Sequence, residues 1–84
     1  MKQIDFIPQG VCSYGIHLVR DEQDRVAEVQ FAGGCHGNLQ GIAALVKGMP
    51  AEEVVKRLQG IRCGSKATSC PDQLCCAIKE LMAR

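Results

Sequence analysis

Six cysteines are the residues of this 84-residue chain best suited to chemistry. Three of them fall within the stretch TSCPDQLCC, residues 68–76, and the others are Cys12, Cys35 and Cys63. Thiolate ligands favour zinc or an iron–sulfur cluster over magnesium or calcium. Cysteines also form disulfides, or fill a core as small apolar side chains. Which of these applies depends on which cysteines the fold brings together.

Composition limits the class of protein. A chain of this length, with 46% hydrophobic and 23% charged residues, is expected to form one globular domain over residues 1–84. The net charge of +1 argues against a nucleic-acid-binding face, and no apolar run is long enough to span a membrane. The start, MKQIDFIPQG, lacks the apolar stretch of a secretory signal, so a cytoplasmic location is expected. In a reducing compartment the cysteines favour metal binding, although their even number leaves a disulfide framework open.

The first half of the chain carries strand patterns. QIDFI, VCSYGIHLV and RVAEVQFA are rich in β-branched and aromatic residues and lack helical periodicity. The intervening PQG and DEQD have turn chemistry, so the three segments predict an antiparallel meander. Alternation predicts that Cys12, Tyr14, Ile16 and Leu18 share one face of the second strand. In the third strand it predicts that Ala27, Val29 and Phe31 share a face.

After Gly33 and Gly34 the hydrophobic period becomes helical. Three helices are predicted, one through residues 39–46, one over residues 51–59 and one over residues 70–82. Ser69 and Asp72 form a capping signature at the start of the last helix. The fold class is therefore α+β, a three-stranded antiparallel sheet followed by three helices packed on one face.

This topology brings four cysteines to one end of the domain. A hairpin centred on DEQD places Cys12 near Gly33 or Gly34, and hence near Cys35. The first helix leaves that end, the second returns to it, and the GIRCGSKAT loop brings Cys63 close to Cys70. None of the four lies in a C-x2-C pair, so the prediction of a metal site at Cys12, Cys35, Cys63 and Cys70 depends on topology and not on spacing. The competing interpretation is reduced cysteines in a core.

The other candidate ligands have simpler explanations. Cys75 and Cys76 lie inside the last helix and are expected to be packing residues. His36 is expected to be an exposed loop side chain. Replacement of one of the four ligands by Cys75, Asp72 or His36 is left open.

The chain resembles a known family along most of its length. TSCPDQL, together with FAGGCHGNLQGI, LVKGM, EEV and GIRCG, is similar to the stand-alone members of the TSCPD-domain family. The resemblance links the chain to the C-terminal domain of adenosylcobalamin-dependent ribonucleotide reductases. It implies an associated domain without autonomous catalysis, because 84 residues leave no room for a reductase barrel or a cobalamin site.

A second resemblance is to the U-type iron–sulfur scaffold proteins. The order of elements is similar, and GVCSYGIHL, GGCHG and SCPDQLCCAIKEL stand where those scaffolds carry their three cysteines. The resemblance implies that Cys12, Cys35 and Cys70 are ligands, and Cys63 is the candidate for the fourth ligand that the scaffold pattern leaves missing. Tyr14 stands where the scaffolds usually have an acid, and Ser69 where a histidine can precede the last cysteine.

One preferred function and three alternatives are therefore expected. The preferred one is a small cytoplasmic metal-binding module, with zinc as the cofactor, that serves as an accessory or interaction domain linked to ribonucleotide reduction. The alternatives are a redox-active thiol partner working through Cys63, Cys70 and Cys75, a nucleotide-binding component of a ribonucleoside-diphosphate reductase system, or an iron–sulfur cluster carrier. The expected partner is a ribonucleotide reductase or another protein, and homodimerisation is left open.

Overall fold

The first half of the chain forms a three-stranded sheet. A computed structural model describes residues 1–84, and in it β1 (Lys2–Phe6), β2 (Ser13–Arg20) and β3 (Val26–Gly33) pair in the order β1-β2-β3. Both pairings are antiparallel, so the predicted meander is confirmed.

The hairpin between β2 and β3 is closed by side chain and backbone together. The Asp21 carboxylate accepts hydrogen bonds from the backbone N–H groups of Gln23 and Arg25, at 2.9 and 3.0 Å. Asp24 takes a left-handed conformation with φ of 60°, which aspartate tolerates better than most residues. This turn sets the register that pairs Ser13 with Gly33 at the other end of the hairpin.

An irregularity at the start of β2 corrects the predicted pattern of faces. The register shifts between Ser13 and Gly15, so Ser13 is buried while Tyr14 is 71% exposed. The prediction that Tyr14 shares one face with Ile16 and Leu18 was therefore wrong. Cys12 precedes β2, and one extra residue in a strand reverses the direction of the side chains before it.

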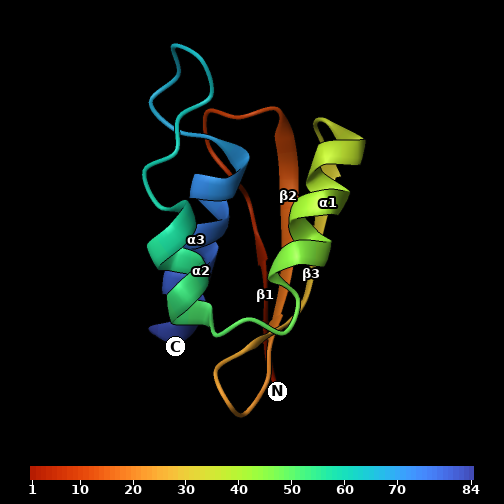
Figure 1. Ribbon diagram of the computed structural model, residues 1–84, viewed down its shortest axis with the longest axis vertical. Coiled ribbons are helices and arrows are strands. Elements are labelled where there is room, and N and C mark those ends of the chain that lie inside the picture. Colours follow the sequence, from red (N-terminus) through yellow and green to blue (C-terminus); the bar gives the residue numbers. More distant parts are fainter.

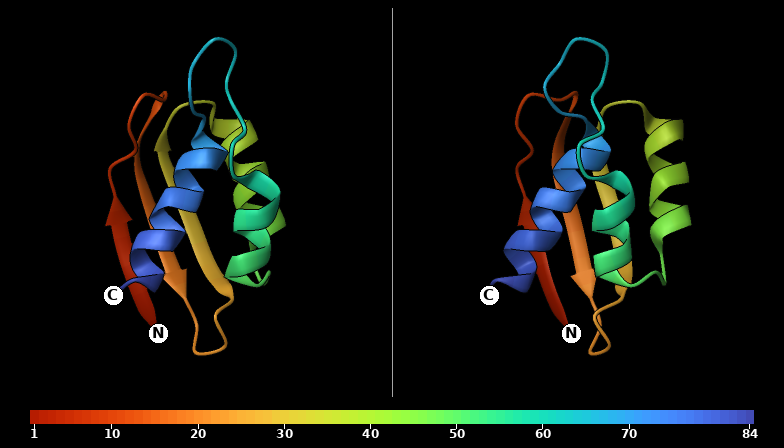
Figure 2. Two further views of the ribbon diagram at one scale, coloured as in Figure 1. Left: turned by 90° about the vertical axis from the view of Figure 1, so that its left-hand side faces the viewer. Right: turned by 60° about the vertical axis from the view of Figure 1, so that its left-hand side comes forward.

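Three helices follow and pack against the sheet, as predicted. They are α1 (His36–Val46), α2 (Ala51–Leu58) and α3 (Cys70–Met82). Figure 2 shows α2 and α3 over one face of the sheet, with α1 alongside β3. The α1–α2 connection is tied to the hairpin by backbone hydrogen bonds, including Ala51 N–H to the Asp24 carbonyl oxygen at 2.8 Å.

The core lies between the sheet and the helices. Partly exposed apolar side chains, among them Phe6 and Phe31, extend it at its edges. The central cluster has these twelve buried members: Ile4, Ile16, Leu18, Val26, Val29, Val46, Ala51, Val54, Leu74, Ala77, Ile78 and Leu81.

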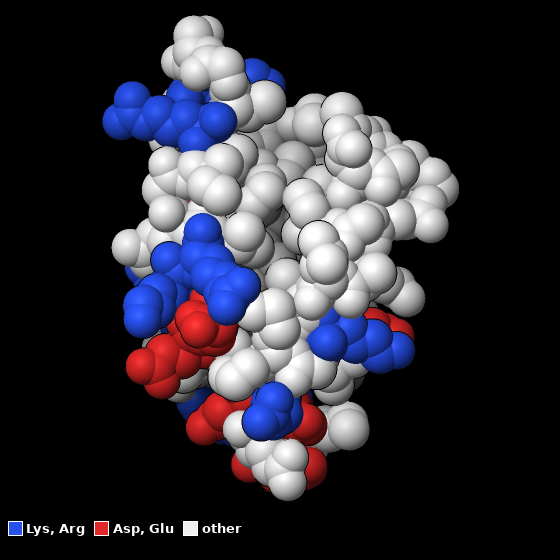
Figure 3. All heavy atoms as spheres, in the orientation of Figure 1, with Lys and Arg blue, Asp and Glu red and all other residues white.

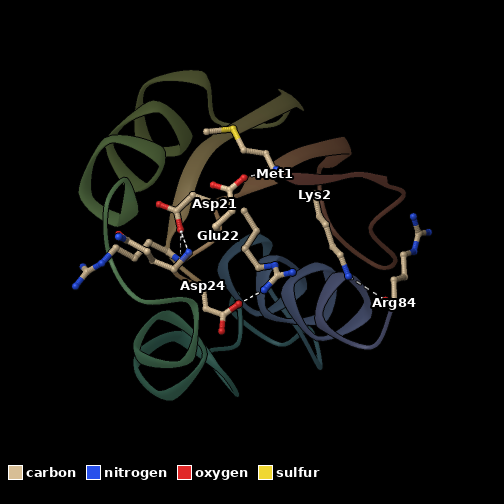
Figure 4. Close-up of polar contacts among 9 residues, drawn as sticks. Met1, Lys2, Asp21, Glu22, Asp24 and Arg84 are labelled. Carbon is tan, nitrogen blue, oxygen red and sulfur yellow. Dashed lines mark hydrogen bonds and ion pairs between the residues drawn. The ribbon is translucent and has the colours of Figure 1, made fainter.

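The two ends of the molecule differ in chemistry. One end holds both chain termini and the β2–β3 hairpin (Figure 1). There the Met1 amino group contacts Glu22 at 2.7 Å, and the Lys2 ammonium donates to the backbone oxygen of Arg84 at 3.2 Å (Figure 4). The other end holds the β1–β2 connection, the β3–α1 turn and the α2–α3 connection (Figure 1). None of the helices has the length and apolar character needed to cross a membrane.

Candidate functional site

The N-terminus of α3 presents Cys70 to the sheet. Ser69 is the N-cap, and its side-chain oxygen accepts a hydrogen bond from the Asp72 backbone N–H at 3.2 Å, as the capping signature predicts. Pro71 lies in the first turn, where a missing N–H has no cost. The cap begins the helix at Cys70 and so fixes the direction in which that side chain leaves the backbone.

The sulfur of Cys70 lies against the sulfur of Cys12. The two Sγ atoms are 3.9 Å apart, although 58 positions separate the residues in the chain. The Ser13 hydroxyl lies 3.2 Å from the Cys70 sulfur. Cys70 and Ser13 are buried, whereas Cys12 is exposed. The irregular start of β2 produces this arrangement, because it turns Ser13 inward beneath Cys70.

Gly34 makes room for the Cys12 sulfur. A Cβ at Gly34 would lie 3.1 Å from Cys12 Sγ, 2.9 Å from Leu39 Cδ1 and 3.3 Å from the backbone nitrogen of Ser13. Gly34 also has φ of +74°, a conformation that residues with a Cβ rarely adopt. The glycine pair before α1 is therefore explained by a close approach and a left-handed turn.

Hydrogen bonds and charge stabilise the thiolate form of Cys12. The pKa of Cys12 is lowered chiefly by the hydrogen bond with Cys70. The backbone amides of Cys35 and of Cys12 itself and the positive charge of Lys66 lower it further, and desolvation opposes them. A thiolate is the form of cysteine that binds metals and attacks disulfides.

Cys35 and Cys63 lie at the same end of the molecule, but their side chains do not join the Cys12–Cys70 contact. Cys35 is the exposed N-cap of α1, and only its backbone amide contributes to the lowered pKa of Cys12. Cys63 is exposed in the α2–α3 connection, where its N–H donates to the Thr68 carbonyl oxygen at 3.1 Å. The structure contains no group of three or more His, Cys, Asp or Glu side chains that could hold a metal ion.

The remaining candidates differ in burial. Cys75 is 1% exposed and faces the carbonyl oxygens of α2, and burial raises its pKa to about 11. Its predicted packing role agrees with this position. Cys76 is exposed, so the packing interpretation was wrong for it: a residue one step further around α3 faces away from the core. His36 is exposed as predicted, but it is the first residue of α1 and not a loop residue, and its ring contacts the Gln40 side chain at 2.9 Å.

Asp72 has a role that sequence reasoning missed. One carboxylate oxygen accepts from the Gly60 N–H at 2.7 Å and the other from the Thr68 hydroxyl at 2.5 Å. Gln73 Nε2 also donates to the Thr68 hydroxyl, and Gln73 Oε1 accepts from the Gln9 N–H. The β1–β2 connection and the α2–α3 connection are thus both hydrogen-bonded to the first turn of α3. The polar residues at positions 68, 72 and 73 were the available signal, but Gly60 and Gln9, to which they bind, lie in other segments of the chain.

Removing the Asp72 carboxylate is expected to destabilise the domain. Asp72→Ala should lower the free energy of unfolding at neutral pH by about 1 kcal/mol, because two hydrogen bonds to a charged acceptor are lost at a partly exposed position. Urea denaturation of the variant beside Glu80→Ala, an exposed acid of the same helix, measures the effect. An equal loss in both variants would contradict the role of Asp72.

The same carboxylate gives a pH dependence of known sign. The Thr68 and Gly60 hydrogen bonds lower the pKa of Asp72 in the folded protein below the ordinary 3.8. Its contribution is therefore complete above that ordinary value and is lost as pH falls through the lowered folded pKa. The stability difference between Asp72→Ala and the unmodified protein should shrink correspondingly in acid.

The end of the molecule that carries Cys12 and Cys70 is poor in acids. Residues 6–20, 29–51 and 54–71 contain no Asp or Glu. Arg62 and Lys66 lie in the α2–α3 connection, and neither forms an ion pair. In Figure 3 the acidic side chains lie in the lower half of the face shown. The charged side chains visible on the loop at the top are all basic. Asp72, whose oxygens are already bonded, is the acid nearest in sequence to Cys70.

One of three comparisons with known proteins gave a match. The family model described as the TSCPD domain matches residues 1–82, nearly the whole chain. Neither the search of curated proteins nor the search of solved structures found a match.

Proposed function

We propose that this chain, which belongs to the TSCPD domain family, binds one zinc ion through the thiolates of Cys12, Cys35, Cys63 and Cys70. The observation that carries the proposal is the 3.9 Å contact between the sulfurs of Cys12 and Cys70. Zinc–sulfur bonds of about 2.3 Å place tetrahedral thiolate ligands roughly 4 Å from one another. Two of the four proposed ligands therefore already have a separation suitable for a common metal ion.

The other two ligands have short paths to this pair. Cys35 directly follows Gly34, where an added Cβ would lie 3.1 Å from the Cys12 sulfur, and Cys63 is hydrogen-bonded to Thr68, two residues before Cys70. Both side chains are exposed, so rotation about their side-chain bonds meets little packing resistance. The chemistry of the set, four thiols with no nearby free carboxylate, favours zinc over magnesium or calcium.

Such a zinc ion would have a structural role. It would join the start of β2, the start of α1 and the α2–α3 connection to the N-terminus of α3. A site closed by four thiolates leaves no open position for a substrate. The proposed role is thus an accessory or interaction domain, without catalysis of its own at the metal, and association with ribonucleotide reduction follows from the family resemblance. An iron–sulfur cluster is the alternative occupant of the same thiolates.

Metal titration of the reduced protein tests the proposal. We expect one zinc per chain, and a loss of affinity on the order of 100-fold or more when Cys12, Cys35, Cys63 or Cys70 is replaced singly by serine. Cys76→Ala, which removes an exposed thiol outside the set, should bind zinc like the unmodified protein. Anaerobic purification with measurement of iron and of visible absorption distinguishes a cluster from zinc.

Zinc should also raise the melting temperature, because binding to the folded state alone stabilises that state by mass action. Subsequent chelation should reverse the rise. Absence of zinc binding by the reduced protein, or equal binding by Cys12→Ser and Cys70→Ser, would refute the zinc site.

A further inference from the structure

We propose that, in the metal-free protein, Cys12 and Cys70 form a thiol–disulfide exchange pair that reacts with small anionic disulfides. This proposal rests on the sulfur–sulfur contact and on the charges around it, and does not depend on zinc. A bound zinc ion would occupy both thiolates and block the exchange. The two proposals can therefore fail independently of each other.

The geometry suits a reversible disulfide. A disulfide has a sulfur–sulfur bond of about 2.05 Å, and the two Sγ atoms lie 3.9 Å apart without one. Cys12 lies in the connection before β2, outside the sheet ladder, so it can shift without breaking strand pairing. Cys70 is held by the cap of α3. Closing the bond thus requires a movement of the exposed residue towards the fixed one.

Exposure assigns different roles to the two thiols. Cys12 is exposed and can meet a disulfide from solution, whereas Cys70 is 7% exposed and cannot. In the first step the Cys12 thiolate attacks one sulfur of the substrate R–S–S–R. The substrate S–S bond breaks, a Cys12–S–S–R bond forms, and one thiol R–SH leaves after taking up the proton that Cys12 gave to solvent.

Cys70 completes the reaction in a second step. Its sulfur loses a proton, attacks the Cys12 sulfur and displaces the second R–S⁻, which takes up that proton. The protein has then lost two electrons and two protons, and the substrate has become two molecules of R–SH. The Ser13 hydroxyl, 3.2 Å from the Cys70 sulfur, is a positioning group that can donate to Cys70 as negative charge develops there.

The charges around the pair select the substrate class. Arg62 and Lys66 lie in the adjoining α2–α3 connection, on either side of Cys63, and neither has an ion-pair partner. The polypeptide segments around them lack acids, and the Asp72 oxygens are already bonded. An anionic disulfide would be attracted to this end of the molecule, and a cationic one repelled.

Trapping experiments on chelator-treated, reduced protein test the reaction. With dithiodipropionate, an anionic disulfide, we expect the loss of two thiols per chain and, by peptide mapping, a Cys12–Cys70 disulfide. In Cys70→Ser the reaction should stop after the first step, with Cys12 in a mixed disulfide with one mercaptopropionate group of the reagent. Cys12→Ser, a change at an exposed position, should form neither product, and Cys76→Ala should behave like the unmodified protein.

Two results would overturn the exchange pair. One is a disulfide that joins other cysteines as the main product. The other is unchanged oxidation kinetics in Cys12→Ser, with circular dichroism confirming that the variant is folded.

The charge preference is measured against cystamine, a cationic disulfide. The two disulfides differ in intrinsic reactivity, so the rate of each with the protein is divided by the rate of the same disulfide with a neutral small thiol. After this correction dithiodipropionate should react about three- to tenfold faster than cystamine at low salt. The preference should fall with added salt and in the double variant Arg62→Ala, Lys66→Ala, but persist in Lys47→Ala, at the C-terminus of α1. Equal corrected rates for the two disulfides would overturn the proposed substrate class, and retention of the preference in the double variant would overturn its assignment to Arg62 and Lys66.

Discussion

Gly34→Ala is expected to lower the free energy of unfolding by about 2–4 kcal/mol and to move the Cys12 sulfur away from Cys70. Two independent costs combine at this position. Alanine is strained at φ of +74°, and its Cβ would lie within 3.3 Å of a leucine methyl, the Cys12 sulfur and a backbone nitrogen. The backbone nitrogen belongs to Ser13 at the start of β2 and cannot move without disturbing the strand.

Two other glycines separate these costs. Gly48 has φ of +86° but no neighbour near its would-be Cβ, so Gly48→Ala should show the conformational cost alone, about 1 kcal/mol. Gly41 lies inside α1 with ordinary φ and open space, so Gly41→Ala should stabilise the protein by up to about 1 kcal/mol. Urea denaturation of the three variants measures these differences.

The chemistry at Cys12 provides a second readout for Gly34→Ala. Zinc affinity and the rate of Cys12–Cys70 disulfide formation should both fall, whereas Gly48→Ala should leave both unchanged. A Gly34→Ala protein as stable as Gly48→Ala would show that the close approach at Gly34 has no energetic consequence.

Leu74→Ala is expected to destabilise the protein by about 3 kcal/mol, a large part of the stability of a domain this small. Leu74 is fully buried in α3 and belongs to the central cluster between the sheet and the helices. Truncation removes buried apolar surface and leaves a cavity, because the close-packed neighbours relax only in part.

Leu45→Ala is the matched control. Leu45 is 78% exposed on α1, so the same change in the same kind of element should alter stability by less than about 0.5 kcal/mol. Thermal and urea unfolding of both variants, checked by circular dichroism, give the comparison. Similar losses at the two positions would contradict the placement of the core between α3 and the sheet.

The order of elements was predictable because its signals are local. Period-two segments ending in turn residues gave the three strands, and helical spacing after Gly33 gave the helices. Ser69 and Asp72 identified the start of α3 because a helix cap is made within four residues. Element order and connection lengths were then enough to predict that the segments carrying Cys12, Cys35, Cys63 and Cys70 share one end (Figure 1).

The α+β fold could therefore be predicted from the sequence, and so could the end of the molecule at which four cysteine-bearing segments lie. Which side chains meet at that end could not be predicted, because it depends on tertiary contacts. The irregularity at Ser13, a register shift in the pairing with β3, turns a serine inward and Tyr14 outward. Asp72 reaches the distant Gly60, and Cys12 contacts Cys70 while Cys35 and Cys63 remain exposed. Local patterns specify backbone periodicity, but such contacts depend on strand register and side-chain rotation, which are set by long-range packing.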